Sequence, residues 1–70
     1  MPANSKVTEL QSQLDALLNT LDHALTELAQ ARADKSLPAI TLAAGRVHHI
    51  TGTIEQVSTR LDVAIKWEAE

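Results

Sequence analysis

The sequence has 70 residues, no cysteine and a formal net charge of −3. Disulfide bridges and thiolate metal sites are therefore excluded, and six Lys and Arg residues are too few for the concentrated basic surface that nucleic-acid binding needs. Ten Leu, four Ile and four Val favour folding over disorder, although a core of this size is only marginally stable alone. No apolar stretch approaches the roughly 20 residues of a membrane span, and the polar start is unlike a secretory signal, so we expect a cytoplasmic protein.

In the first half of the chain, apolar residues recur at alternating intervals of three and four, the spacing of an amphipathic helix. The series is Val7, Leu10, Leu14, Leu17, Leu21, Ala24, Leu28 and Ala31. Leu18 and Leu25 widen this stripe on one flank. Asn4 or Ser5 can cap the start of the helix. The pattern predicts a helix over about residues 5–34.

Pro38 marks a break, because proline cannot continue a preceding helix but suits the first turn of a new one. Ser36 or Leu37 is then the expected cap, and we predict a turn over about residues 35–37. The same apolar spacing resumes in a second series: Ile40, Ala43, Val47, Ile50, Ile54, Val57, Leu61 and Ala64. A strand over 47–57 is disfavoured because Val47 and Ile50 would point to opposite faces. The second helix is expected over about residues 38–68.

These elements predict an all-α fold, an antiparallel two-helix hairpin that spans residues 1–70 as a single domain. The apolar stripe is wider than one pair of helices needs, which is typical of a helix in a four-helix bundle. We therefore expect two hairpins to form a homodimer, and the alternative is one hairpin docked on a different protein. The residues expected in the core or the dimer interface are Leu14, Leu18, Leu21, Leu25, Leu28, Val47, Ile50, Ile54, Val57 and Leu61.

Two features away from the stripe are candidate partner sites. Val63 and Trp67 are four residues apart and hence neighbours on one helix face, and Trp is enriched at interface hot spots. Trp67 can instead fold across the open end of the hairpin and cover Val7 and Leu10.

Gly45 and Gly52, seven residues apart, form a line without side chains that would let another helix approach closely. The alternative is that these are solvent-facing positions where bulk does not matter. The predicted partner-binding residues are thus Trp67, Val63, Gly45, Arg46, His49 and Gly52.

The spacing of the polar residues indicates neither a metal site nor a catalytic site. His23, His48 and His49 lack chelating spacing, so we expect no metal and no cofactor. No nucleophile and base pair, phosphate loop or carboxylate pair is present, so we expect no enzyme and no small-molecule substrate. Asp62 and Lys66 have the spacing of a helical ion pair. Arg46 and Arg60 are expected to be able to meet acidic groups of a second copy, such as Glu27 or Glu9.

The size and hairpin plan are similar to the short helical co-chaperones of type III secretion needle subunits and to small phage-encoded proteins that disable a host regulator or motor. This likeness covers length and outline only, and it assigns no residue a role. The leading hypothesis is a protein-protein interaction module that binds a larger protein and regulates or inhibits it by occluding a surface. The alternatives are a co-chaperone of an aggregation-prone subunit and a structural oligomerisation module.

Overall fold

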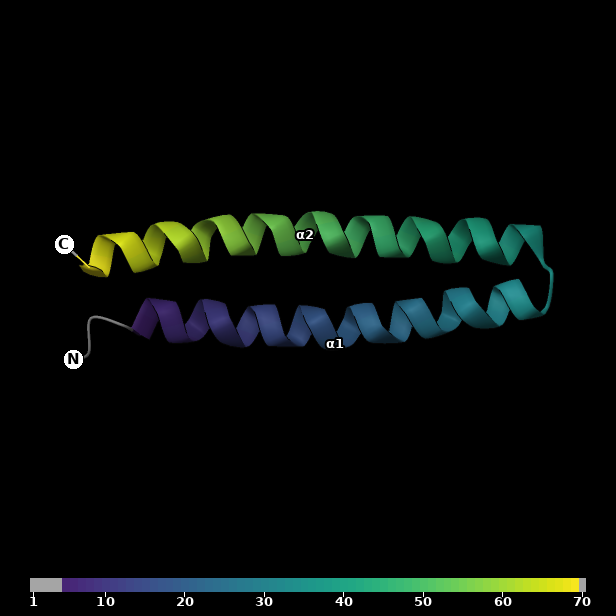
Figure 1. The fold of residues 1–70 in the computed structure, drawn as a ribbon, viewed down its shortest axis with the longest axis horizontal. Helices are drawn as coiled ribbons and strands as arrows, with labels where there is room; N and C mark the ends of the chain where they lie inside the picture. The colour runs from purple at the N-terminus through teal and green to yellow at the C-terminus, as the bar shows by residue number, and fades with distance from the viewer. Residues whose placement is uncertain (1–4, 70) are drawn as a thin grey trace.

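The structure is a computed structural model that describes residues 5–69, and it is an antiparallel pair of helices (Figure 1). Helix α1 spans Ser5–Ala33 and helix α2 spans Leu37–Ala69. The two helices pack against each other along their length, with the start of α1 and the end of α2 at one end of the pair and the turn at the other. The expected all-α hairpin is confirmed.

Helix α2 is long despite many β-branched residues, which usually lower helix propensity. Thr residues in the helices donate their hydroxyls to carbonyl oxygens of the preceding turn: Thr20 to Ala16, Thr26 to Asp22, Thr51 to His48, Thr53 to His49 and Thr59 to Glu55. Such local bonds satisfy the hydroxyls without a partner from another element. The Thr-rich middle of α2 is helical, with the described hydroxyl bonds made inside the helix.

The turn is a Schellman motif, in which amides after the helix bond back to its last carbonyls. The Ser36 amide donates to the Ala31 carbonyl oxygen at 3.2 Å, and the Lys35 amide donates to the Arg32 carbonyl oxygen at 3.1 Å. Lys35 holds the left-handed position of this motif, with φ of 56°. Glycine usually fills that position, because a Cβ atom is strained there.

Ser36 also starts α2, which begins at Leu37, one residue before the expected Pro38. Its hydroxyl oxygen accepts a hydrogen bond from the Ala39 amide at 3.4 Å, and its carbonyl oxygen accepts one from the Ile40 amide at 2.9 Å. Ser36 is therefore the N-cap. Pro38 lies in the first turn of the helix, where its missing amide hydrogen leaves no bond unmade.

The core between the helices is thin and built mostly from small residues. Among the described residues the buried hydrophobic side chains are Leu10, Ala24, Ala31, Ala43 and Val57. No large side chain is fully buried in this part of the chain. Other residues of the two apolar series are only partly buried: Val7, Leu14, Leu17, Leu21, Leu28, Ile40, Val47, Ile50, Ile54, Leu61 and Ala64.

The shape explains this incomplete burial. The radius of gyration is 16.0 Å, whereas a compact chain of this length has about 11 Å. The accessible surface is 5374 Å², whereas a compact monomer of 7.6 kDa exposes about 4,300 Å². The hairpin is a rod of two helices with no third element to cover its broad faces.

We predict that Lys35→Gly stabilises the hairpin, because it relieves the strained backbone of the turn. The expected gain is about 1 kcal/mol, and Lys35→Val should lower stability because a β-branched residue tolerates positive φ least. Thermal unfolding followed by circular dichroism measures both changes. Equal melting temperatures for the two variants would contradict the role assigned to the turn.

Candidate protein-interaction surfaces

The hairpin has two different broad faces, one on each side of the seam between the helices. At about 100° per residue, Leu25 and Glu27 lie on opposite flanks of the α1 seam. Glu27 pairs with Arg46 of α2 across one of these flanks, at 2.9 Å between the Glu27 Oε2 and Arg46 Nη1 atoms. On the opposite side of the seam, the flank of α1 that carries Leu25 therefore lies beside the flank of α2 that does not carry Arg46. We call the Leu25 side the apolar face and the Glu27 side the grooved face.

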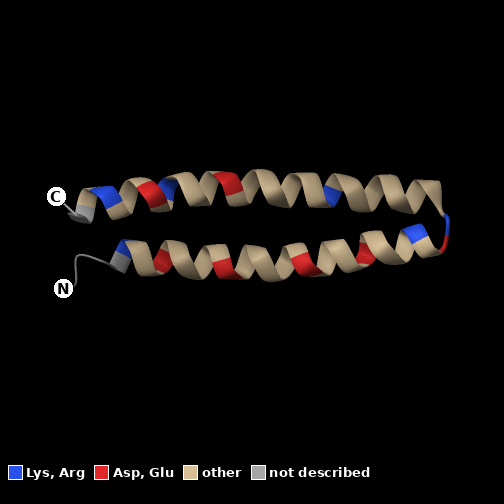
Figure 2. Ribbon diagram, in the orientation of Figure 1, with Lys and Arg blue, Asp and Glu red and all other residues tan. Residues whose placement is uncertain are grey.

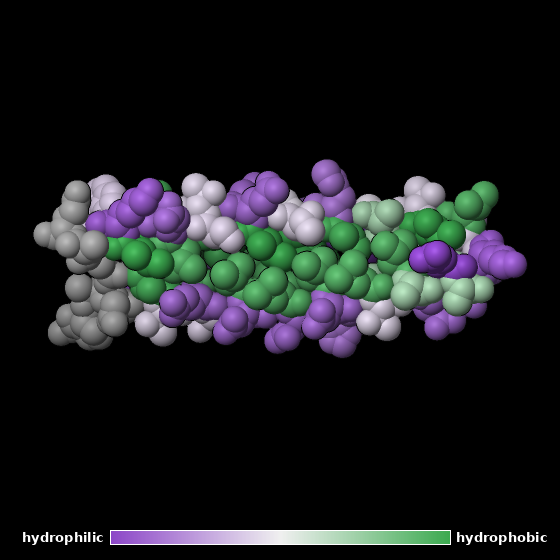
Figure 3. All heavy atoms as spheres, viewed as in Figure 1, coloured by the Kyte–Doolittle hydropathy of each residue, from purple (hydrophilic) through white to green (hydrophobic). Residues whose placement is uncertain are grey.

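The apolar face carries the flank residues that widen the predicted stripe. Leu18 and Leu25 are each 45% exposed, and Ile65 on α2 is 47% exposed. On each helix, residues seven apart form a row along this face, and we call the two rows the flank lines. The row on α1 is Gln11, Leu18, Leu25 and Arg32, and the row on α2 is Leu37, Ala44, Thr51, Ser58 and Ile65. Apolar side chains form a continuous band between the helices in Figure 3. Only one position of the flank lines, Arg32 near the turn, carries a charge.

Two open grooves lie on the grooved face. The central groove has a volume of about 670 Å³ and is lined by Thr20, His23, Ala24, Glu27, Thr41, Leu42, Gly45, Arg46, His49 and Ile50. The terminal groove, of about 450 Å³, lies nearer the chain ends and is lined by Lys6, Leu10, Thr59, Arg60, Val63, Ala64 and Trp67. Arg46, Arg60 and Trp67 are separated by multiples of seven and thus follow one line along α2. The two grooves are about 25 Å apart along this helix.

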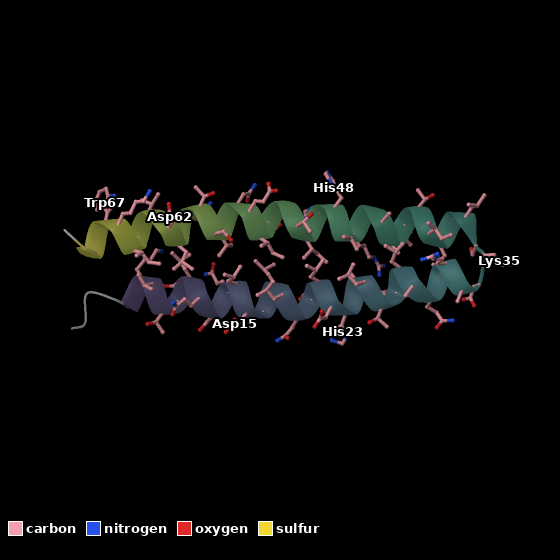
Figure 4. The ribbon with its side chains drawn as sticks, in the orientation of Figure 1. Asp15, His23, Lys35, His48, Asp62 and Trp67 are labelled. Carbon is pink, nitrogen blue, oxygen red and sulfur yellow. The ribbon has the colours of Figure 1, made fainter. Side chains whose placement is uncertain are left out.

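Trp67 does not fold across the end of the hairpin. Its side chain is 75% exposed and points away from α1 (Figure 4), while Leu10 beneath the groove is 3% exposed. Val63, one turn before Trp67, is 46% exposed and lines the same groove. The interpretation of Trp67 as a cover for Val7 and Leu10 is therefore wrong in the hairpin, and its indole is open to solvent.

Neither glycine is required by packing within the hairpin. A Cβ atom added at Gly45 or Gly52 would meet no atom within 4 Å. Gly45 lines the central groove, whereas Gly52 lines neither of the two grooves. The structure therefore groups Gly45, Arg46 and His49 in one place and separates them from Gly52.

The histidines point in different directions. His23 and His48, on opposite helices, extend away from each other (Figure 4). His23 and His49 both line the central groove. Over residues 5–69, no group of three or more His, Asp or Glu side chains gathers where a metal ion would sit. Neither α1 nor α2, as described, has an apolar stretch that would carry it across a bilayer.

Charged residues are distributed unevenly between the helices (Figure 2). Between Lys6 and Arg32, all the charged residues of α1 are acidic. Four exposed carboxylates edge the apolar face, each directly after a residue of the apolar series: Asp15, Asp22, Glu55 and Asp62. The predicted pair of Asp62 and Lys66 is confirmed, with 3.1 Å between Oδ2 and Nζ. The apolar face thus has an acidic rim.

Arg46 pairs with Glu27 of its own chain, with 2.9 Å between the Nη1 and Oε2 atoms. Both side chains are 54% exposed, so the pair contributes only a few tenths of a kcal/mol. Its main effect is on register, because the contact joins residues 19 apart in the chain. Sequence reasoning missed this pair and the positions of Lys6, Leu10 and Leu42 in the grooves, since each depends on how the two helices align.

In comparisons with protein-family models, curated proteins and solved structures, no match to this chain was found.

We predict that Gly45→Ala and Gly52→Ala each stabilise the hairpin by about 1 kcal/mol, because alanine has the higher helix propensity and both sites have room. Thermal unfolding of the two variants and of the double variant tests this. Their effects should add, since the sites are two turns apart. A loss of stability in either variant would show that a Cβ atom there meets a neighbour.

Proposed function

We propose that this protein is a non-enzymatic protein-protein interaction module of the cytoplasm. Two copies associate through their apolar faces into a four-helix bundle, and the grooved faces remain outside to bind a larger protein. Binding regulates or inhibits that protein by occluding part of its surface. The single observation that carries the proposal is the absence of any fully buried large side chain among the described residues of a chain rich in Leu, Ile and Val.

The burial of these residues supports association. Fully burying a Leu, Ile or Val side chain stabilises a protein by roughly 1.5–3 kcal/mol, while ordering a residue costs roughly 1.5 kcal/mol. Leu18 and Leu25 retain nearly half of their exposure in the hairpin. A second hairpin placed on this face removes them from water, together with the partly buried residues of both apolar series. The stability that the hairpin lacks is thereby supplied by its partner.

The dimensions of the apolar face also suit a dimer. Between Cα atoms the broad face measures 52 by 15 Å. A standard stable interface buries about 800 Å² of each partner, so this face offers enough area. Its near lack of charge favours burial, because a charge buried without a partner is costly. A two-fold axis places the same face on both copies.

The grooved face is suited to a different partner. It combines exposed apolar groups, such as Trp67 and Leu42, with charged residues along its edges. Mixed apolar and polar surfaces are typical of regulated, reversible complexes, whereas wholly apolar ones are typical of permanent dimers. A dimer formed through the apolar faces keeps two grooved faces open.

The proposal predicts a discrete dimer in solution. Light scattering across about 1 µM to about 1 mM protein should give a mass of about 15 kDa, twice that of the 7.6 kDa chain, at the upper end. Added salt should strengthen the dimer, because association brings two acidic rims together. A monomer at all concentrations would favour the co-chaperone function, and open-ended growth would favour the assembly module.

We predict that replacing Leu18 and Leu25 together with Glu abolishes the dimer. Each leucine contributes about 1 kcal/mol on burial of its remaining surface, and the dimer contains four of them. The dissociation constant should thus rise about thousandfold, as measured by analytical ultracentrifugation.

Leu42→Glu is the matched control, since Leu42 is 62% exposed on the grooved side. It should leave the dimer intact. Equal weakening by both variants would contradict the assignment of the apolar face. If the Leu18 and Leu25 variant loses its helices altogether at concentrations where the Leu42 variant remains folded, the apolar face supports folding through association, which also agrees with the proposal.

A further inference from the structure

The terminal groove differs from the central groove in its charge. Glu27 and Arg46 neutralise each other beside the central groove. Two cations, Lys6 from α1 and Arg60 from α2, line the terminal groove, and none of the carboxylates whose side chains the structure describes lines it. Neither cation forms an ion pair with any side chain that the structure describes. A positive site of this kind is notable on a chain with a formal net charge of −3.

The apolar part of the terminal groove is built as a floor and a wall. Leu10, which is 3% exposed, and the partly buried Ala64 lie at the floor. Val63, which is 46% exposed, and Trp67, which is 75% exposed, line the groove beside them. The volume of about 450 Å³ accommodates a few apolar side chains. An indole in this setting has a large area to remove from water at a low cost in rotamer entropy.

We propose that the terminal groove binds an acidic amphipathic segment of a partner protein. Apolar side chains of the segment insert between Leu10 and Trp67, and Asp or Glu side chains beside them pair with Lys6 and Arg60. Opposite charges at the rim determine which partner is accepted and how fast it associates, and the apolar anchor supplies most of the affinity.

A second copy of this chain is the less suitable occupant. The dimer proposed above uses the apolar face, on the other side of the seam, and its two-fold symmetry gives two terminal grooves per dimer. The inference rests on the proposed function as a binding module, and it does not depend on dimerisation.

The test is a selection from a displayed library of random peptides of about 16 residues, with the full chain as the target. The proposal predicts that enriched peptides combine closely spaced apolar residues with Asp and Glu, and that added salt weakens their binding. Trp67→Ala should weaken the binding of an enriched peptide about thirtyfold, and Arg60→Glu should weaken it about tenfold.

Arg32→Glu is the matched control, because it makes the same change of charge on the apolar side near the turn. It should leave peptide binding unchanged. The proposal is overturned if no peptide is enriched, if the enriched peptides show no acidic bias, or if Arg32→Glu and Arg60→Glu have equal effects. A dimer that is lost in Trp67→Ala would show that a second copy fills the groove, which also overturns it.

The proposed dimer and the proposed peptide-binding groove can be refuted independently of each other. Salt should strengthen the dimer and weaken the peptide complex. A monomeric chain that still binds acidic peptides through Arg60 and Trp67 would refute the dimer and leave the groove assignment standing. A dimer that binds no acidic peptide would refute the groove assignment and leave the dimer standing.

Discussion

The seam between the two helices determines the rest of this structure, because a helix in a pair can hide only one stripe of its surface. Small residues hold the middle of the seam: Ala24, Ala31 and Ala43 are among the few buried side chains. Small side chains let helix backbones approach closely, but they contribute little apolar area of their own. Apart from Leu10 and Val57, the larger leucines, isoleucines and valines of the described residues are covered only partly by one pair of helices.

Because of this arrangement, the two broad faces differ in charge and in shape. On one side, Leu18 and Leu25 extend the seam into a nearly uncharged surface bordered by carboxylates. On the other, the pair of Glu27 and Arg46 crosses the seam and lines the central groove, and the terminal groove lies further along the rod, away from the turn. In the function we propose, the first face meets a second copy and the other meets a different protein, which is the arrangement of a small adaptor.

Apolar spacing was sufficient to predict both helices, since the interval of three and four is a property of the helix itself, and the short connection between them predicted their antiparallel pairing. Pro38 located the turn within a residue or two. The left-handed Lys35 was not predictable, because glycine is the usual residue at that position. The grooves and the pairing of Arg46 with Glu27 depend on the register between helices, which spacing within one helix does not specify. Whether Trp67 is exposed also depends on this register, so the sequence allowed both a covering and an exposed Trp67.

Nuclear Overhauser effects between a ¹³C-labelled and an unlabelled copy of the chain test the central claim most directly, because they identify the surface that meets the second copy. The account predicts contacts between copies from the methyl groups of Leu18, Leu25 and Ile65, and none from Leu42 or Val63. Contacts from Leu42 and Val63 in place of the others, or none at millimolar concentration, would contradict it.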